Sequence, residues 1–587
     1  MNRVSTTAKA IEARSARWGV VLALGAACVA VGVWLLAEPF RSPSVLAWLV
    51  AVALLLSGIG ELASAQATPR PWLSHIIGAT WIAAGVVAAS QPDITTLAIT
   101  VGVALVGGGA IKIVTALFGN GDERFILGFV GVTNIAVGAF ATAWPAVTVL
   151  ALAVLVGFGT ILFGIGQIAL ALRIRRSPTD RAEQPAQWSR WLRLTGVLVV
   201  LALSLGGLAI SVAVQRAAPG GPGPFYTAPS PLPDGPPGTI IRTEIIDDFH
   251  LGATTYRVLY KSTGFDGTPT AVSGIIVVPD SAAPAGGRNV IAFTHGTVGV
   301  ATNCSPSLQG RSALAVYEGL DEFLAAGYVF AATDYQGLGT PGPHPYLVGE
   351  SAAMNALDSV RAAHNLPEAE AGTDFAVWGH SQGGHASLFT GQLAPTYAPD
   401  LRLVGVAASA PPTDFEELFK VNIQTPVGRI LMAMPLRSWS QVYEDASVDQ
   451  NRHTQARPAI KKIAERCLYD QTQILASVPS SLLLDFTFIS APPWDTEPWS
   501  TIIADNTPGT APTGVPVLVT QGDQDPIMTP SVTAKFVDGL CSNGETVEYH
   551  VLPGIAHLEA GHEAAPYVAE WIADRFADEP APNTCSS

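Results

Sequence analysis

Long apolar runs fill the first 216 residues of this chain, whereas the remainder alternates short apolar runs with polar turns. Each N-terminal run is about long enough to cross a hydrocarbon core of ~30 Å. The runs lie near 18–37, 44–64, 72–90, 94–117, 125–143, 147–172 and 194–214. This pattern predicts seven transmembrane helices. We do not expect a cleaved signal peptide, because such a peptide would account for one apolar region rather than seven.

A repeat of glycines and prolines organises the first six runs. Three positions recur at a constant offset of 53 residues: Gly25, Gly32 and Pro39, then Gly78, Gly85 and Pro92, then Gly131, Gly138 and Pro145. We expect each unit to be a helical hairpin that turns at its proline, with small residues that allow close helix contact. In this pattern residues 18–172 resemble the short-repeat membrane family that includes the acid-resistance protein HdeD. Apart from Lys112, no ionisable residue lies at mid-span in these helices, which favours an anchor or packing module over a transporter.

The loop charges predict how the chain would lie in a membrane. Basic residues gather in the tail 1–17 and in the loop 173–193, whereas the odd-numbered loops carry only Arg41. The positive-inside rule therefore places the N-terminus in the cytoplasm. Because the seventh and last span is 194–214, everything after about 216 then lies outside. The Pro/Gly-rich stretch 215–238 that follows this span is typical of an extended linker.

Charge divides the chain in the same way. Residues 1–216 carry 15 Lys and Arg against 8 Asp and Glu, a net of +7, and the remainder carries 17 against 39, a net of −22. So acidic a C-terminal part argues against nucleic acid as a partner and against flat docking on an anionic membrane.

The C-terminal part contains a strand–turn–helix pattern around one serine. The apolar run 375–378 leads into Gly379-His380-Ser381-Gln382-Gly383, and a helical pattern follows. This is the nucleophile elbow, which predicts Ser381 as the nucleophile and the backbone N–H of Gln382 as an oxyanion donor. A second donor is expected after an earlier strand, 289–294, where Gly296 and Thr297 follow. An ordinary glycine turn is the alternative for that loop.

The elbow also predicts an acid and then a histidine, each after a later strand. Strand 515–520 is followed by Asp523 and Asp525, and strand 546–552 is followed by His557. We favour Asp525 as the acid, with Asp523 as the alternative that caps the turn. His557 would take the proton of Ser381 and return it to the leaving group. The remaining histidines of this part near the motifs are interpreted as structural: His380, His385, His550 and His562.

Three segments of the C-terminal part, 293–299, 333–339 and 378–384, resemble the secretory lipases, the lipase A-type α/β hydrolases of fungi and actinobacteria. The resemblance covers roughly residues 239–580. It implies Ser381, Asp525 and His557 as the triad and hydrolysis of carboxylic esters, acylglycerols above all. It also implies a cap between the sixth and seventh strands, at about 412–512. That segment is rich in apolar side chains, which suit an acyl chain, although helices packing on a core would look the same.

Cysteine use agrees with export of the C-terminal part. Cys28 falls inside an apolar run. The other four cysteines lie in the part predicted to be exported: Cys304, Cys467, Cys541 and Cys585. An even number of cysteines in an oxidising compartment predicts disulfides. Four cysteines allow three pairings, and the lipase resemblance favours Cys304 with Cys467 and Cys541 with Cys585. No Cys/His cluster has zinc spacing and no phosphate loop appears, so we expect neither a metal nor a cofactor.

The sequence therefore predicts an all-α polytopic membrane domain of three helical hairpins plus a seventh helix, followed by an α/β-hydrolase domain, 239–587, with an inserted cap. We predict that the protein crosses the plasma membrane several times. Its extracytoplasmic domain is predicted to be a serine hydrolase that cleaves lipid or other esters. Two alternatives remain: an exported acyltransferase that uses the same triad, and a membrane sensor or stress protein with an accessory hydrolase. The pattern specifies neither the acyl chain and alcohol nor the oligomeric state.

Overall fold

The computed structural model describes residues 71–90, 94–117, 123–143, 221–246, 252–447, 456–469 and 491–585, with a few isolated positions besides. The chain divides into two compact units, Met1–Ala218 and Pro219–Ser587. We describe each unit by itself.

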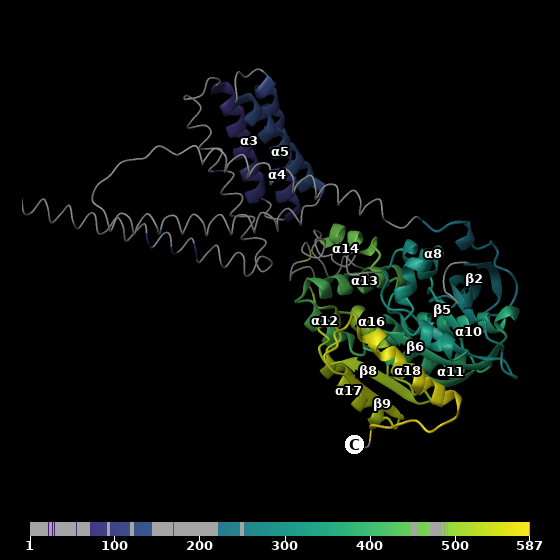
Figure 1. The fold of residues 1–587 in the computed structure, drawn as a ribbon. Coiled ribbons are helices and arrows are strands. Elements are labelled where there is room, and N and C mark those ends of the chain that lie inside the picture. The colour runs from purple at the N-terminus through teal and green to yellow at the C-terminus, as the bar shows by residue number, and fades with distance from the viewer. Residues whose placement is uncertain are drawn as a thin grey trace, which may run out of the picture. The chain divides into compact units, whose positions relative to one another are not determined.

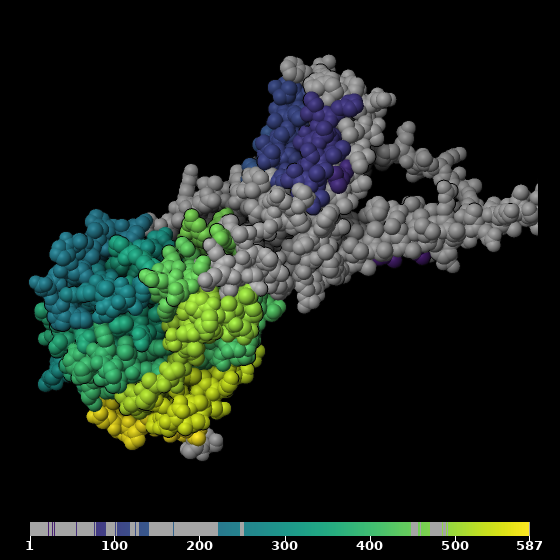
Figure 2. All heavy atoms as spheres, turned by 180° about the vertical axis from the view of Figure 1, so that it is seen from behind, coloured from purple at the N-terminus to yellow at the C-terminus, as the bar shows by residue number. Residues whose placement is uncertain are grey.

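Three helices of the N-terminal unit match predicted apolar runs to within two residues: α3 (Pro71–Ser90), α4 (Ile94–Leu117) and α5 (Glu123–Ala143). Figure 2 shows them as a purple-to-blue group. Glycines let α4 and α5 approach closely. A Cβ added at Gly109 would lie 2.6 Å from the carbonyl oxygen of Gly131, and one at Gly138 would lie 2.5 Å from that of Gly102. The repeat glycines Gly131 and Gly138 thus occupy the helix contact, as a small-residue packing pattern requires.

The structure does not support the prediction that these helices are membrane spans. Among the described residues, none of the helices combines the length and the apolar character needed to cross a bilayer. The runs at 18–37, 44–64, 147–172 and 194–214 lie outside the described residues, apart from isolated positions.

A nine-stranded sheet forms the centre of the C-terminal unit, in the order β1-β2-β3-β5-β4-β6-β7-β8-β9. Strands β1 to β3 and β5 pair antiparallel, and the pairs from β5 to β9 are parallel. The carboxyl ends of the parallel strands therefore meet at one edge of the sheet, where open α/β sheets bind ligands. The strands are β1 (Ile240–Ile245), β2 (Ala253–Thr263), β3 (Pro269–Pro279), β4 (Arg288–Thr294), β5 (Val329–Thr333), β6 (Ala371–His380), β7 (Arg402–Ser409), β8 (Val517–Gly522) and β9 (Val547–Leu552).

Helices cover both faces of this sheet (Figure 1). One face packs against α10 (Gly349–His364), α11 (Gln382–Tyr397) and α17 (Pro530–Ser542), and the other against α9 (Leu320–Ala325) and α18 (Ala560–Phe576). The central strands are buried on both sides, which explains their continuous apolar runs. Short elements complete the unit: η2 (Pro224–Tyr226), η3 (Thr302–Cys304), α8 (Pro306–Gln309), η4 (Gly310–Val316), η5 (Pro367–Ala369) and η7 (Pro493–Asp495).

The predicted cap is an insertion of helices between β7 and β8. It contains α12 (Phe415–Asn422), α13 (Pro426–Val442), α14 (Arg457–Ala464) and α16 (Trp499–Asp505). The prediction that it follows the sixth strand is wrong by one, because the antiparallel strands at the start of the sheet add a strand to the count. Much of its apolar content builds its own core, in which Trp439 and Trp499 are fully buried.

The prediction of an extended linker at 215–238 is wrong for its described part, residues 221–238. Tyr226 is buried, and its hydroxyl lies 3.0 Å from Oγ of Ser307. Nη1 of Arg242 donates to the carbonyl oxygens of Pro224 and Phe225 at 2.9 and 2.7 Å. The buried ring of Tyr226 and the hydrogen bonds from Arg242 therefore hold this Pro/Gly-rich segment against the hydrolase unit.

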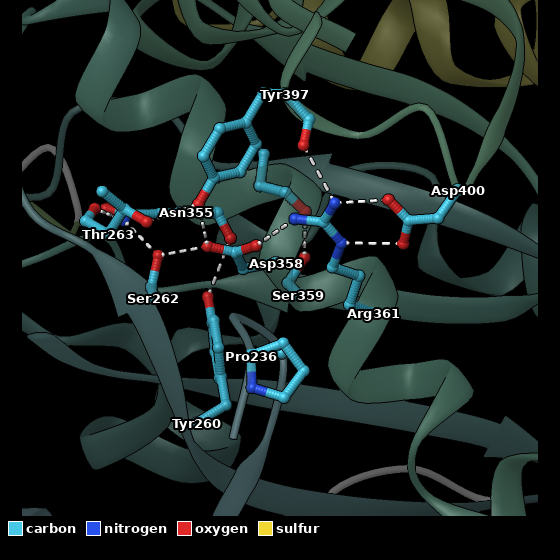
Figure 3. Close-up of polar contacts among 12 residues, drawn as sticks. Pro236, Tyr260, Ser262, Thr263, Asn355, Asp358, Ser359, Arg361, Tyr397 and Asp400 are labelled. Atoms are coloured by element: carbon cyan, nitrogen blue, oxygen red, sulfur yellow. Dashed lines mark hydrogen bonds and ion pairs between the residues drawn. The ribbon is translucent and has the colours of Figure 1, made fainter. Parts of the chain in front are cut away.

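A buried carboxylate on α10 holds several elements together (Figure 3). Asp358 accepts hydrogen bonds from Oγ of Ser262 at 2.7 Å, from the hydroxyl of Tyr397 at 2.9 Å and from Nη1 of Arg361 at 2.9 Å. Burial raises the pKa of Asp358 above its usual value, while these donors oppose the shift. Because both oxygens have partners that come from β2, α10 and α11, this is a structural carboxylate.

Candidate active site

Ser381 lies at the sharp turn between β6 and α11, in a strained conformation. Its φ of 56° and ψ of −119° are unusual for a residue with a side chain. The flanking glycines make the turn possible. A Cβ at Gly379 would lie 2.3 Å from the carbonyl oxygen of Thr294, and one at Gly383 would lie 1.8 Å from the same atom. The end of β4 therefore leaves no room for larger residues at either position, and the turn is the predicted elbow.

The three predicted triad residues come together at the carboxyl ends of β6, β8 and β9. Nε2 of His557 lies 2.9 Å from Oγ of Ser381, and its Nδ1 lies 2.7 Å from Oδ2 of Asp525. Asp525 is 4% exposed. Burial opposes ionisation of Asp525, but hydrogen bonds from His557 and from the backbone N–H groups of Ile527 and Met528 outweigh it and lower the pKa of this carboxyl. The arrangement holds a carboxylate, an imidazole and a hydroxyl in one hydrogen-bonded line.

Asp523 is not part of this line. Its side chain is exposed, and Oδ1 accepts the N–H of Gly554 at 2.7 Å. It therefore joins two loops that are 31 positions apart in the chain, rather than capping only its own turn.

The predicted oxyanion donors lie beside Ser381. Gln382 is the first residue of α11, and an N–H at a helix start has no acceptor within the helix. Gly296 and Thr297 line the same cavity as Ser381. A Cβ at Gly296 would lie 3.4 Å from the carbonyl oxygen of His380, so this loop lies against the elbow.

The side chains of this region are held by groups that the sequence pattern did not identify. Nε2 of His344 lies 3.5 Å from Nε2 of Gln382, and its Nδ1 lies 2.9 Å from the carbonyl oxygen of Gln336. Burial lowers the pKa of His344 to about 3, so the ring is neutral and can accept from the Gln382 amide while it donates to Gln336. The hydroxyl of Tyr346 lies 2.8 Å from Oγ1 of Thr297.

Two of the histidines interpreted as structural lie close to the triad. The ring of His380 lies 4.9 Å from that of His557, centroid to centroid, and its Nδ1 lies 3.0 Å from Oε1 of Glu318. His562 is in the first turn of α18, and its Nε2 lies 3.1 Å from the carbonyl oxygen of Ala315. Both line the cavity at Ser381. Glu318 sits in a loop with no recognisable motif, so no sequence signal marked it.

The other two histidines make packing contacts away from the nucleophile. Nε2 of His385 lies 2.8 Å from the carbonyl oxygen of Asn506, and the ring of His550 stacks on Tyr567 with 4.1 Å between centroids. Within the part of the chain that the structure describes, no group of His, Cys, Asp or Glu is arranged to hold a metal ion.

Ser381 lines two cavities. The larger measures about 260 Å³ and has polar side chains in its wall, among them Glu318, His380 and Tyr469. The smaller measures about 40 Å³ and lies against cap helices α12 and α13, with a wall that is mainly apolar: Leu347, Phe415, Leu418, Phe419, Leu431, Met432 and Met528. Ser381 therefore lies between a cavity whose wall mixes polar and apolar side chains and a cavity whose wall is mainly apolar.

The structure contains the two disulfides that the lipase resemblance implied, Cys304–Cys467 and Cys541–Cys585. The first ties the loop after β4 to the cap, where Leu468 and Tyr469 follow and line the larger cavity. The second ties the C-terminal tail to the end of α17. Cys28 lies outside the described residues.

Family models match both halves of the chain. The model of the secretory lipase family matches residues 315–584, and that of a short repeat of unknown function (DUF308) matches residues 23–88 and 129–211. These matches confirm the two resemblances that the motifs suggested.

Individual relatives and solved structures agree with the C-terminal match. A Mycobacterium tuberculosis protein named "Probable inactive lipase MT1628" is 25% identical over 375 residues, which cover 61% of this chain and 82% of that protein. Lipase A of Arthroderma benhamiae is 26% identical over 383 residues, which cover 60% and 79%. The crystal structure of lipase A from Candida antarctica superposes with a TM-score of 0.56 at 20% identity, covering 63% of this chain and 90% of that one, and shows the same fold.

The C-terminal half of the chain therefore has a lipase-type α/β-hydrolase fold and matches the secretory lipase family, and the N-terminal half matches short repeats of the DUF308 family.

Proposed function

We propose that the C-terminal unit is a serine ester hydrolase in which Ser381 is the nucleophile, His557 the general base and acid, and Asp525 the group that orients the imidazole. The observation that carries the proposal is the continuous line from Oγ of Ser381 to Nε2 of His557 at 2.9 Å and from Nδ1 to Oδ2 of Asp525 at 2.7 Å. Asp525 holds the proton of neutral His557 on Nδ1, so Nε2 is free to accept the serine proton.

The reaction would run in two steps. Oγ of Ser381 forms a bond to the ester carbonyl carbon as its proton passes to Nε2 of His557, and the carbonyl oxygen becomes an oxyanion. The backbone N–H groups of Gln382 and of the Gly296–Thr297 loop would donate to that oxyanion. The alcohol then leaves with the proton from His557. Water, activated by the same histidine, releases the acid from Ser381.

The two cavities support an ester with an apolar acyl part. The smaller one offers phenylalanine, leucine and methionine side chains beside Ser381, and such walls favour hydrocarbon over a charged group. Relatives include a protein named secreted triacylglycerol lipase, from Malassezia restricta, which matches 35% of this chain. One relative is named as inactive. In this chain all three triad side chains are present and hydrogen-bonded, and we infer an active enzyme.

Turnover by the full chain tests this proposal. We expect hydrolysis of p-nitrophenyl esters and labelling by a serine-directed phosphonate, and we expect Ser381→Ala to abolish both. The matched control is Ser312→Ala, which removes an exposed hydroxyl that donates to the carbonyl oxygen of Gln309 in its own turn. Ester hydrolysis that persists at the wild-type rate in Ser381→Ala would assign the chemistry to another group.

We further propose that the N-terminal half holds the hydrolase at a membrane, with the catalytic unit outside the cytoplasm. The support comes from the sequence: seven apolar runs, four of them almost wholly outside the described residues, and loop basic residues that, apart from Arg41, lie in the N-terminal tail and the even-numbered loops. Two disulfides in the hydrolase unit agree with an oxidising compartment. A reporter fused after Ser587 should be active only outside the cytoplasm, and the chain should resist extraction from membranes by carbonate. Cytoplasmic reporter activity would contradict this topology.

A further inference from the structure

The smaller cavity at Ser381 is a blind pocket. Of the described residues that line it, Thr297, Ser381 and Leu431 are half-buried, and the remainder are buried. These same three residues also line the larger cavity. Within the part of the wall that the structure describes, the smaller cavity therefore opens where the two cavities meet, beside the nucleophile.

Aromatic rings back the wall of this pocket on the side of the cap. Phe415 and Phe419 of α12 line the pocket, and both pack on Trp439 of α13, with 5.9 and 6.4 Å between ring centroids. Trp439 is fully buried, and its Nε1 donates to the carbonyl oxygen of Tyr346 at 2.9 Å. Behind the two phenylalanines lies the close-packed core of the cap, so this wall cannot recede without a cost.

The larger cavity, in contrast, reaches the surface. Its lining includes Leu558, which is 46% exposed, and His562, which is also exposed. It measures about 260 Å³, and the blind pocket about 40 Å³. Because a cavity of about 150 Å³ holds one benzene ring, the blind pocket fits about two or three carbon atoms and the larger cavity roughly ten.

The position of His557 indicates which part of an ester each cavity receives. The leaving alcohol takes its proton from Nε2 of His557, so the alcohol must lie on the side of Ser381 where this histidine is. His557 lines the larger cavity and is not among the described residues that line the blind pocket. Gln382, whose N–H is proposed to bind the oxyanion, lines the blind pocket. The larger cavity is thus the place of the alcohol, and the blind pocket is left for the acyl group.

We propose that this hydrolase is specific for short acyl groups, of about two to four carbons, carried by a bulky alcohol of roughly ten heavy atoms. The phenylalanines of α12 set the upper limit on the acyl chain. This inference rests on the proposed hydrolase function and adds to it the size of each half of the ester.

Two isomeric esters test which cavity takes which half: 4-phenylbutyl butyrate and butyl 4-phenylbutyrate. They have the same atoms and both release a primary alcohol, but the phenyl ring lies on the alcohol in the first and on the acid in the second. With the full chain, we expect kcat/KM to be about tenfold or more higher for the first ester, because a ring on the acid must be forced into a packed wall.

A chain-length series tests the limit itself. For the p-nitrophenyl esters of acetic, butyric, hexanoic and octanoic acid, we expect kcat/KM to be highest at acetate or butyrate. It should fall about tenfold or more by octanoate, since added methylene groups meet a close-packed core.

Phe419→Ala should lengthen the pocket towards the core of the cap and raise the ratio of octanoate to butyrate turnover about tenfold. Each ratio comes from one preparation, so a loss of folded enzyme cancels. The matched control is Val421→Ala on the same helix, where the side chain is 45% exposed and the ratio should change less than about twofold. If Phe419→Ala does not fold, Met432→Ala opens the same wall from α13.

Three results would overturn the inference while leaving the hydrolase proposal intact. They are equal or reversed preference between the two isomers, wild-type turnover of octanoate that equals that of butyrate, and an unchanged ratio in the folded variant of the cap wall. Absence of turnover on every ester would instead overturn the hydrolase proposal, and this inference with it.

Discussion

Replacing Asp525 by asparagine tests whether catalysis needs the carboxylate that orients His557, because the histidine itself stays in place. In the wild type, Oδ1 accepts the backbone N–H groups of Ile527 and Met528, both at 2.8 Å, and Oδ2 accepts from His557 at 2.7 Å and from Nε2 of Gln521 at 3.1 Å. An asparagine has one carbonyl oxygen. Two rigid backbone donors will hold it at the Oδ1 position, so the NH₂ group faces His557 and Gln521.

The consequence is a change of tautomer. Nδ1 of His557 must then accept from the asparagine, which leaves the proton on Nε2, where it points at Oγ of Ser381 and removes the base. Loss of the base by this route costs about 10⁴-fold in kcat, or roughly 5.4 kcal/mol of transition-state stabilisation. The cost to folding should be much smaller, about 1–3 kcal/mol, because the main change is that Gln521 loses its carboxylate acceptor and faces a donor.

Single-turnover and steady-state rates on a p-nitrophenyl ester measure this effect, with Asp523→Asn as the matched control. Asp523 accepts only the N–H of Gly554, and an amide oxygen can accept it equally well, so we expect less than about a twofold change. If Asp525→Asn kept more than a tenth of the wild-type kcat, or if Asp523→Asn lost as much as Asp525→Asn, the assignment of the acid would be refuted.

Three further predictions follow from the packing. Gly383→Ala should abolish both activity and a cooperative thermal transition, because the added Cβ would lie 1.8 Å from a carbonyl oxygen at the end of β4; a wild-type melting curve would contradict this. Replacing Cys304 and Cys467 together by serine opens a loop of 163 residues and should lower the free energy of unfolding by about 2–5 kcal/mol in urea titrations; an unchanged midpoint and slope would contradict it. Burial lowers the pKa of His344 to about 3 and of His385 to about 4, so as the pH falls below about 6.5 the unfolded chain takes up protons first. Stability should then decrease between pH 6.5 and 4 by at most about 1.4 kcal/mol per pH unit for each histidine, and His385→Gln should reduce this slope; equal slopes in urea titrations at each pH would contradict the reasoning.

The elements around the triad could be predicted because their signals are local. The glycines of the elbow are required by the close approach of β4, and that requirement appears in the sequence as a fixed spacing around Ser381. The choice of Asp525 over Asp523 followed from the same kind of spacing after Gly522, although the bond from Gly554 to Asp523 comes from a distant loop and could not be foreseen.

Other features depend on contacts between distant segments. Proline and glycine dominate residues 221–238, so composition suggested a linker, and a single buried aromatic, Tyr226, reverses that interpretation. The strand count differed by one because β1, at the edge of the sheet, is mostly exposed and gives a weaker signal than the buried run of β4. Glu318 reaches the site only because β6 brings His380 to it, and nothing in the neighbouring sequence indicates that pairing.

The two disulfides divide the catalytic groups among covalent rings. Ser381 lies inside the ring closed by Cys304 and Cys467, His557 lies inside the ring closed by Cys541 and Cys585, and Asp525 lies on the peptide between them. A protease that cuts once within either ring releases no fragment while the sulfurs stay bonded, so cleavage in the part of the cap before Cys467 would leave the nucleophile covalently joined to the rest of the unit. A single cut between the rings separates the acid and the histidine from the serine only if it falls before Asp525. Outside the cell, where proteases are frequent and thiols are scarce, such an enzyme would survive nicks in the first part of the cap, up to Cys467, as one molecule.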